Sequence, residues 1–337
     1  CAGEKSAAES RLVVMRAVLV TEANTPLLLV TDHPEPVAQG DAEIIDVTAC
    51  GVCHSDLHVV EGVFPSPLPM VLGHEVTGVH AELGPVMVYA PWGCRSCVLC
   101  DRGLENMCAN ATEAGLFTDG GYADRMLVKH RRYLAPLDGL DPIASAPLAC
   151  GGLTAWRAVQ HGLELLRERG SHGRATVVGA GGLGQYAISY LRLLTDAQVT
   201  AVDIADDKLA ASIEIGAHHA VHADALADVP PGDVVLDFIG NEATLTNAVH
   251  HVARQGLVIV VGLALGRVPF GFGAVPHEAR LMSSIWGSRS ELDDVLALAR
   301  REPTLLRAVD VLPLADAQVA HDRLRMGQTR GRIVLTT

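Results

Sequence analysis

The sequence predicts an α/β fold in which a doubly wound domain with a parallel sheet joins a second, mostly antiparallel β domain. From Met15 to about Ala90, short runs of alternating polarity lie among many Val, Thr, Gly and Pro residues, as in antiparallel β domains. After Arg174, apolar runs alternate with segments of helical spacing, which is typical of a parallel sheet covered by helices. The length of 337 residues favours two domains, because one core seldom grows beyond about 250–300 residues.

The individual elements follow from these patterns in chain order. In the first domain, alternating runs predict strands at 43–48 and 76–81. In the second domain, the same reasoning predicts strands at 175–179, 199–203, 234–239 and 257–261, and helices at 183–194 and 207–215. After Ser284, an expected helix at 291–301 and a strand at 332–336 indicate that the chain returns to the first domain.

Composition excludes several classes of protein. A formal net charge of -13 argues against nucleic-acid binding, which needs clustered Lys and Arg. No apolar run approaches the roughly 18 residues of a membrane span, so we expect no membrane partner.

Residues 1–14 lack the features of a secretory signal and are expected to be a tag remnant or a frayed arm, with Met15 as the natural start. Eight cysteines are too few for a disulfide scaffold, so we expect a cytoplasmic enzyme.

Four closely spaced cysteines predict a structural zinc site. Their order is Cys-x2-Cys-x2-Cys-x7-Cys, formed by Cys94, Cys97, Cys100 and Cys108. Four thiolates can complete a tetrahedral shell around one zinc and leave no open position. A set of buried free thiols is the simpler alternative, but the surrounding Gly, Arg and Asp residues offer no apolar core. A nucleic-acid-binding zinc module is a further alternative, but it would need a basic surface, which the net charge of -13 opposes.

A dispersed second set of ligand types predicts a catalytic zinc. Cys53, His74 and Cys150 would give a metal with three protein ligands and an open fourth position. Each of them alone is weak evidence, and Cys1 and Cys50, which lack such neighbours, are expected to be ordinary structural residues.

Polar residues around these ligands suit proton transfer from an alcohol. Ser55 and His58 could carry a proton from a zinc-bound oxygen to solvent. Asp56 and Glu75 are candidates for carboxylates that orient a ligating histidine, although each could instead be a solvated loop charge.

A glycine-rich turn predicts a dinucleotide site. Gly179, Gly181, Gly182, Leu183 and Gly184 belong to a GxGxxG motif that follows an apolar strand and opens a helix. Asp203 ends the next expected strand, where a carboxylate accepts hydrogen bonds from ribose hydroxyls and repels a 2′-phosphate. The expected cofactor is therefore NAD rather than NADP.

Together these motifs resemble the medium-chain, zinc-dependent alcohol dehydrogenase family over nearly the whole chain, from Met15 to Thr337. The resemblance implies a GroES-like catalytic domain at 1–151 with a structural zinc lobe at about 92–110, a Rossmann domain at 152–285, and a return segment at 286–337. It implies hydride transfer between a primary or secondary alcohol and NAD, giving an aldehyde or ketone, with two zinc ions per chain. It also implies a homodimer or homotetramer.

The same resemblance extends to cofactor contacts. Lys208 is similar to the family's adenosine-ribose lysine, and Arg332 to an arginine that meets the pyrophosphate. His54 stands where some relatives carry Arg for the same phosphate, which implies a weaker charge contact. Trp92 is expected either to line the substrate pocket or to pack in the core.

One segment is shorter than the family pattern. We expect that residues of a surface loop are missing between Pro85 and Val86, where the family has about ten more residues. The alternative is a two-residue hairpin at Gly84 and Pro85, which Pro suits poorly.

Two other functions compete with the dehydrogenase. A zinc-free quinone or enoyl reductase of the same superfamily would not need Cys53, His74 and Cys150. A non-enzymatic NAD-binding protein would not need Ser55 and His58.

Overall fold

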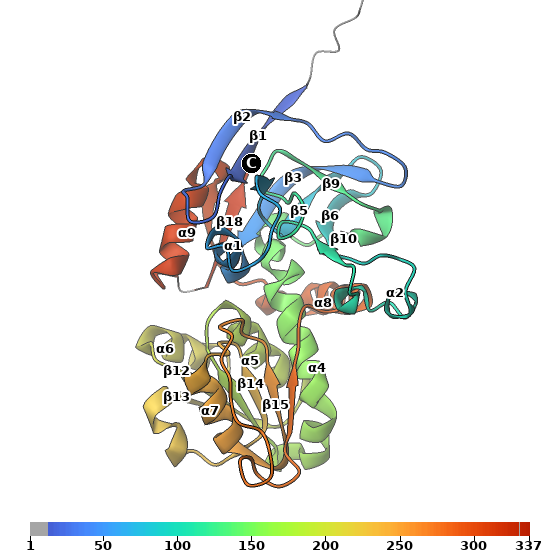
Figure 1. Ribbon diagram of the computed structural model, residues 1–337. Helices are drawn as coiled ribbons and strands as arrows, with labels where there is room; N and C mark the ends of the chain where they lie inside the picture. The colour runs from blue at the N-terminus through green and yellow to red at the C-terminus, as the bar shows by residue number, and fades with distance from the viewer. Residues whose placement is uncertain (1–12, 330) are drawn as a thin grey trace, which may run out of the picture.

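The computed structural model describes residues 13–329 and 331–337. Two bodies lie one above the other, and the long helix α4 (Gly151–Arg169) passes from one to the other (Figure 1). The upper body contains the N-terminal strands together with the C-terminal strands and helix, whereas the lower body is built from the middle of the chain. The described part contains no helix that is both long and apolar enough to cross a membrane.

The upper body is built around a seven-stranded sheet. Its order is β10-β6-β5-β3-β18-β17, with β9 also pairing with β3, and its only parallel pair is β17 with β18. The strands are β3 (Glu43–Val52), β5 (Glu75–His80), β6 (Gly84–Val88), β9 (Arg125–Val128), β10 (Leu134–Pro136), β17 (Val309–Pro313) and β18 (Arg332–Thr336). The predicted strands at 43–48 and 76–81 correspond to β3 and β5.

Smaller elements complete this body. A three-stranded sheet has the order β2-β1-β4, and β7 pairs with β8. The strands are β1 (Val14–Val20), β2 (Leu28–Pro34), β4 (Met70–Val71), β7 (Pro91–Trp92) and β8 (Thr112–Glu113), and the helices are α1 (His54–Val60), α2 (Val98–Asp101), α3 (Pro142–Ser145) and α9 (Ala317–Arg325). Val14 pairs with Pro34, so the expectation that Val14 belongs to a frayed arm is wrong. Cys1 lies outside the described residues.

The lower body is a doubly wound domain, as the sequence predicts. Its six strands are all parallel in the order β13-β12-β11-β14-β15-β16. The order reverses between β11 and β14, and ligands of such sheets bind outside the carboxyl ends of the strands at this point. The strands are β11 (Arg174–Val178), β12 (Gln198–Asp203), β13 (His219–His222), β14 (Gly232–Asp237), β15 (Val252–Val260) and β16 (Arg280–Ser283), and the helices are α5 (Gly182–Leu194), α6 (Asp206–Glu214) and α7 (Glu242–His251).

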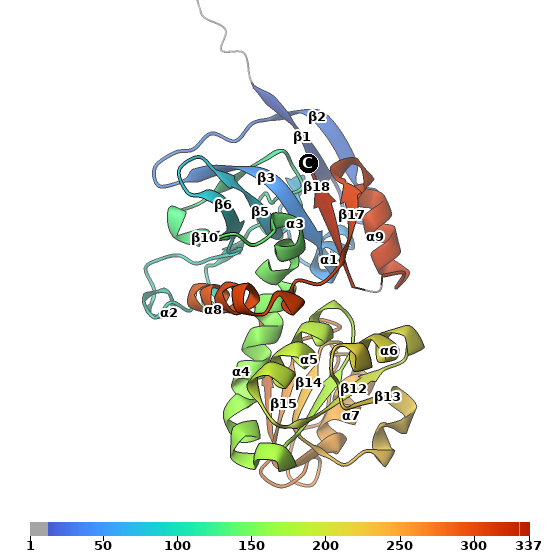
Figure 2. The ribbon, with the colours of Figure 1, turned by 180° about the vertical axis from the view of Figure 1, so that it is seen from behind.

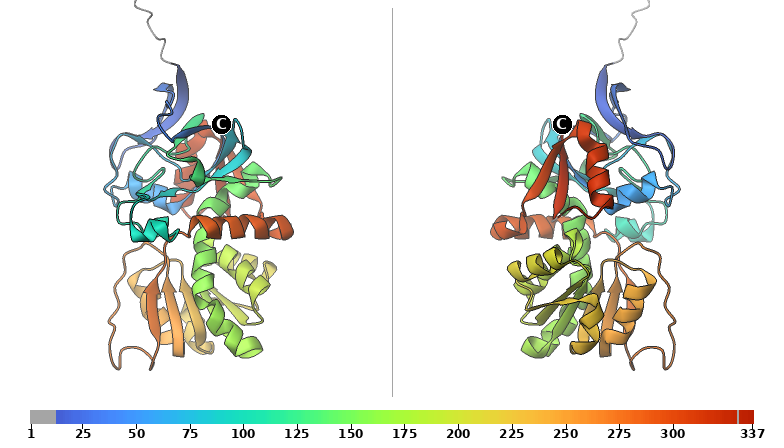
Figure 3. Two further views of the ribbon diagram at one scale, coloured as in Figure 1. Left: turned by 90° about the vertical axis from the view of Figure 1, so that its right-hand side faces the viewer. Right: turned by 90° about the vertical axis from the view of Figure 1, so that its left-hand side faces the viewer.

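The chain returns to the upper body after β16. Helix α8 (Arg289–Arg301) lies across the junction between the two bodies (Figure 2) and beneath the upper sheet (Figure 3). A capping box at its start explains where it begins, since the Ser288 hydroxyl accepts from Glu291 N and the Glu291 carboxylate accepts from Ser288 N. Strand β18 then inserts between β3 and β17, so residues more than 280 positions apart share one sheet.

The expectation of missing residues between Pro85 and Val86 is wrong. Strand β6 runs through both residues without a break, with Val79 opposite Pro85 and Gly78 opposite Val86. The chain turns earlier, at residues 81–83, where His80 Nδ1 accepts hydrogen bonds from the backbone N–H groups of Glu82 and Leu83 at 3.3 and 3.1 Å. A histidine side chain closes this hairpin, and the usual Gly and Pro turn patterns do not reveal it.

Candidate active site

The four clustered cysteines have the geometry of a closed metal site. Their Sγ atoms all lie within 4.8 Å of one another, with 3.9 Å between Cys94 and Cys100 and 3.8 Å between Cys97 and Cys108. Four thiolates at about 2.3 Å from a tetrahedral zinc would be about 3.8 Å apart. Hydrogen bonds from Ser96 lower the pKa of Cys94 to about 6, which favours the thiolate form that a metal requires. These residues could therefore hold zinc without an open position.

A second cluster lies where three separate segments meet. Cys53 caps the start of α1, His74 immediately precedes β5, and Cys150 immediately precedes α4. Their ligand atoms and one Glu75 oxygen all lie within 4.8 Å of one another, and all four residues are buried. His74 Nε2 has no hydrogen-bond partner among the described residues. A bound metal ion would satisfy a buried nitrogen that has no partner and lies beside two thiols, so the residues fit zinc.

Asp56 controls the orientation of His74. Its Oδ1 lies 3.1 Å from His74 Nδ1, and its Oδ2 accepts from Cys53 N at 2.9 Å. Because the carboxylate can only accept, the proton of neutral His74 is on Nδ1 and the Nε2 lone pair is free for a metal. Asp56 thus contacts the ring nitrogen of His74 that faces away from the cluster, and its role in orienting a metal ligand stays a prediction.

Glu75 has a different partner from the one expected. Its Oε1 pairs with the guanidinium of Arg332, and its Oε2 has no hydrogen-bond partner in the described part of the chain. Burial raises the pKa of Glu75 to about 7, although the positive charge of Arg332 opposes this shift. The expectation that Glu75 orients a ligating histidine is therefore wrong, because Asp56 already occupies His74 Nδ1.

The two relay candidates lie on α1, whose first turn follows Cys53. Ser55 Oγ is 3.9 Å from Cys53 Sγ. His58 lies one helical turn further on, with its ring 5.4 Å from that of Phe64 and its buried Nδ1 unpartnered among the described residues. No hydrogen bond joins Ser55 to His58 within the described residues, so a relay would need a substrate or water to connect them.

The glycine-rich turn has the backbone that a dinucleotide site requires. Gly179 follows β11 with a φ of 86°, and a side chain at Gly184 would collide with the Gly179 carbonyl. The turn is held by Asp203, whose Oδ2 accepts from Ala180 N at 2.8 Å. Its Oδ1 accepts from Ile204 N and Ala205 N at 2.8 and 3.1 Å. The carboxylate therefore lies between this turn and the start of α6, where Lys208 follows.

Arg332 joins the metal cluster to this turn. A side chain at Gly182 would collide with Arg332 Cδ, while the guanidinium pairs with Glu75. Partial desolvation, together with the positive charges of Arg332 and Lys208, lowers the pKa of His54 at the start of α1. The residues expected to contact the phosphate and ribose, His54, Arg332 and Lys208, are thus close enough for the charges of Arg332 and Lys208 to act on His54.

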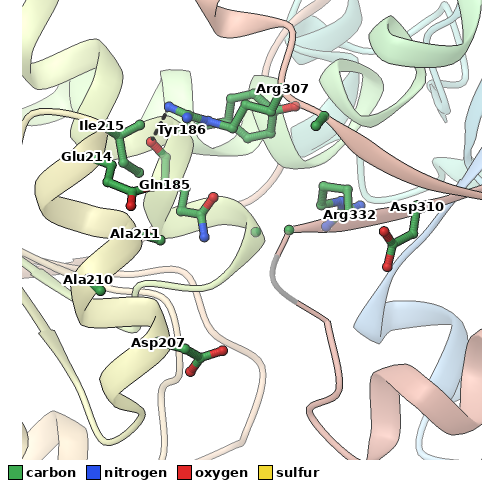
Figure 4. Close-up of a pocket in the computed structure, with 13 residues that line it drawn as sticks. Gln185, Tyr186, Asp207, Ala210, Ala211, Glu214, Ile215, Arg307, Asp310 and Arg332 are labelled. Carbon is green, nitrogen blue, oxygen red and sulfur yellow. Dashed lines mark hydrogen bonds between the residues drawn. The ribbon is translucent and has the colours of Figure 1, made fainter.

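A pocket of about 720 Å³ opens between α5, α6 and the return segment (Figure 4). Gly182 and Arg332 line it, and Arg332 and Asp310 face Asp207 across it. Arg307 reaches over Gln185 at its upper edge. The pocket therefore borders the glycine turn on the side of the return segment.

Comparisons with known proteins identify the family. Residues 39–139 match the alcohol dehydrogenase GroES-like domain, and residues 182–301 match the zinc-binding dehydrogenase domain. The D-arabinose 1-dehydrogenase (NADP(+)) of Saccharolobus solfataricus is 32% identical, over 96% of this chain and 98% of that protein. The NAD-dependent alcohol dehydrogenase of Sulfurisphaera tokodaii is 30% identical, over 95% and 99%. The chain belongs to the zinc-dependent alcohol dehydrogenase family.

Solved structures of this family agree with the fold. The crystal structure of the alcohol dehydrogenase from Aeropyrum pernix superposes with a TM-score of 0.88 at 29% identity, covering 96% of this chain and all of that one. The predicted family, the fold class and the assignment as an oxidoreductase are therefore confirmed.

Sequence reasoning missed several residues of this family member's site. Trp286 packs edge-on against His74, with 5.4 Å between ring centroids, and adopts a φ of 51° that is rare for a bulky residue. Tyr122 donates a hydrogen bond to the far side of Asp56, and His321 contacts the Tyr122 hydroxyl. No local pattern marks these three residues, since each reaches the site only through the tertiary fold. Trp92 packs on Tyr133 in the core, as the second of its two expected roles predicts.

Proposed function

We propose that the protein transfers a hydride between a primary or secondary alcohol and NAD, interconverting the alcohol with its aldehyde or ketone. The main support is that Cys53, Cys150 and the unpartnered Nε2 of His74 meet in one buried cluster. Arg332 connects this cluster to the glycine turn, because it pairs with Glu75 and lies against Gly182. These three residues would hold a zinc ion, which would supply a Lewis acid that lowers the pKa of an alcohol substrate. The chain is therefore a zinc- and NAD-dependent dehydrogenase.

The remaining residues of the cluster bind, orient and transfer a proton. Asp56 holds His74 in the tautomer that leaves Nε2 free. Ser55 accepts the proton of the substrate hydroxyl as it gives up its own proton, and a water molecule carries that proton to His58 and on toward the surface. Glu75 neutralises the charge of Arg332 between cofactor and metal. The four-cysteine lobe of Cys94, Cys97, Cys100 and Cys108 holds a second, structural zinc.

The cofactor is held by backbone and charge. The glycine turn and the start of α5 bind the pyrophosphate, with Arg332 and His54 nearby. The carboxylate of Asp203 binds the adenosine ribose hydroxyls and Lys208 lies beside it. NAD is supported by this carboxylate and by the NAD-dependent relative, although another relative is described as using NADP.

Several other parts of the proposal concern the whole molecule. Domain boundaries at 1–151, 152–285 and 286–337 are supported by the sheet order, since every strand of the parallel sheet falls between residues 174 and 283. A cytoplasmic location and a homodimer or homotetramer complete the proposal, with a small alcohol, aldehyde or ketone as the only other partner.

A substrate screen tests the proposed function. Zinc-loaded protein is assayed for NADH formation with a panel of primary alcohols, secondary alcohols and aldoses, and for NADH consumption with the matching carbonyl compounds. We expect turnover with at least one alcohol, and none by Cys53→Ser. NADH formation that does not depend on added alcohol, or that persists in Cys53→Ser, contradicts the proposal.

A further inference from the structure

We propose that Tyr122 and His321 are positioning residues that fix the Asp56 carboxylate and, through it, the imidazole of His74. The inference rests on the proposed function, in which His74 binds the catalytic zinc. It extends the machinery of the site to the C-terminal helix α9, which carries His321.

The four side chains form one continuous buried chain of contacts. His74 Nδ1 lies 3.1 Å from Asp56 Oδ1, Tyr122 Oη lies 3.0 Å from Asp56 Oδ2, and His321 Nε2 lies 3.3 Å from Tyr122 Oη. None of the four residues is more than 1% exposed. The rings of Tyr122 and His321 also meet edge-on, with 5.9 Å between their centroids. Water therefore has no access to replace any of these bonds.

The direction of each bond follows from which groups can donate. Asp56 is an acceptor only, and a bond to a charged acceptor is roughly twice as strong as a neutral one. Tyr122 therefore donates its one proton to Asp56. The contact with His321 is then made only if His321 Nε2 carries a proton and donates it to the tyrosine oxygen.

The protonation of His321 agrees with a hydrogen bond donated from His321 to Tyr122. A neutral histidine protonated on Nε2 has a bare Nδ1, and His321 Nδ1 has no partner among the described residues. Burial lowers the pKa of His321, which favours the neutral ring. All donors thus point toward Asp56: His321 to Tyr122, Tyr122 to Asp56, and His74 to Asp56 from the other side.

The contact between Tyr122 and Asp56 affects how firmly His74, the proposed metal ligand, is held. Asp56 Oδ2 is held by two donors, Cys53 N and the Tyr122 hydroxyl. Removing the hydroxyl leaves Cys53 N as the remaining donor to Oδ2, so the carboxylate is held less firmly and is a less fixed acceptor for His74. Mutating a group that hydrogen-bonds directly to a metal ligand typically lowers metal affinity about 10- to 100-fold. Tyr122 contacts Asp56 rather than the ligand His74, so its loss should have an effect of about tenfold or less.

The experiment measures how fast each of the two zinc ions leaves the holoenzyme to a chromogenic chelator. Tyr122→Phe keeps the ring and removes only the hydroxyl, so we expect the catalytic zinc to leave about three- to tenfold faster. His321→Leu should accelerate release less, because Tyr122 can still donate to Asp56. The double variant should match Tyr122→Phe alone, since the two residues act in series. His321→Gln, which can keep a donor, should restore part of the loss.

Two controls separate positioning from general loosening. Tyr190→Phe removes the hydroxyl of another fully buried tyrosine, which has no hydrogen-bond partner among the described residues. Its catalytic zinc should leave at the wild-type rate, and the structural zinc should leave at the wild-type rate in every variant. Wild-type release of the catalytic zinc from Tyr122→Phe, or equal acceleration at both sites, overturns the inference. A wild-type chain that binds only one zinc contradicts the proposed function instead.

Discussion

The guanidinium of Arg332, at the start of β18, pairs with the carboxylate of Glu75, at the start of β5, although 257 residues separate them in the chain. Both side chains are buried, and Arg332 also lies against Gly182 in the glycine turn. The pair therefore connects the candidate metal cluster to the cofactor turn through a single contact.

Breaking this pair on one side should be costly. Arg332→Met leaves a buried carboxylate without its counter-charge, so we expect a loss of about 3–5 kcal/mol in the free energy of unfolding. The double variant with Glu75→Gln removes both charges and should recover most of that loss. Denaturant unfolding of the zinc-loaded variants measures this, and equal losses in the single and double variants would show that the pairing is not the cause.

The two metal clusters should differ in how they hold zinc. We expect two zinc ions per chain. Cys53→Ser should abolish turnover and leave the fold intact, whereas Cys100→Ser should lower the melting temperature, because a closed metal site contributes folding energy directly. Metal analysis, thermal melting and activity check each variant. One zinc per chain, or full activity of Cys53→Ser, would contradict the assignment.

The charge of Asp203 should determine the choice of cofactor. Asp203→Asn keeps one acceptor oxygen but removes the charge that repels a 2′-phosphate. A charge-assisted hydrogen bond is worth about 1.5–3 kcal/mol, so kcat/KM with NAD should fall roughly tenfold to a hundredfold while that with NADP rises. Asp237→Asn is the matched control, since Asp237 Oδ1 accepts from two backbone N–H groups at the end of β14. It should leave the NAD to NADP ratio unchanged; a wild type that already prefers NADP refutes this role of Asp203.

Trp286 should limit the size of the substrate. Hydrogen bonds hold the backbone on either side of Trp286. Asn106 donates to the carbonyl of Ile285 at 3.1 Å, and Tyr89 donates to the carbonyl of Gly287 at 2.8 Å. Replacing the ring beside His74 with a small side chain should open space at the metal cluster. We expect Trp286→Ala to lower KM for bulky secondary alcohols about tenfold relative to ethanol. An unchanged ratio between bulky and small alcohols would place Trp286 outside the substrate site.

Acid should weaken the nucleotide-binding body partly through His251. Burial and the nearby charge of Arg174 lower the pKa of His251, which lies 3.1 Å from Thr176 Oγ1. Since the unfolded chain binds this proton more readily, the contribution of His251 is fully present above about pH 6.5 and is lost as the pH falls below it. His251→Gln keeps a hydrogen-bonding side chain without the titration. Its melting temperature should therefore fall less than that of the wild type between about pH 7.5 and pH 5.5.

Some of the site could be predicted because its signal is local. The spacing of Cys94, Cys97, Cys100 and Cys108 brings four thiols together within one lobe, whatever the rest of the chain does. The glycine turn is equally local, since a short apolar strand, the glycines and the following helix are consecutive in sequence. Asp203 followed from the same pattern, because parallel neighbours end at the same edge of the sheet.

Other features depend on turns and partners that no local pattern marks. The β5–β6 hairpin is closed by the side chain of His80, so the turn residues of the sequence do not predict its position. The choice between Asp56 and Glu75 as the partner of His74 depends on where Arg332 enters from the far end of the chain.

The sequence by itself determined the fold class, the candidate ligands of two metal sites and the glycine turn, because these depend on side-chain chemistry and short-range spacing. Only the tertiary structure decided which carboxylate orients His74, that Trp286 packs against it, and that Tyr122 and His321 lie behind Asp56. These contacts join residues up to 212 positions apart, from His74 to Trp286. They exist because β18 and α9 pack back onto the first domain, and burial in that shared core leaves each polar group with no partner except the one the fold brings to it.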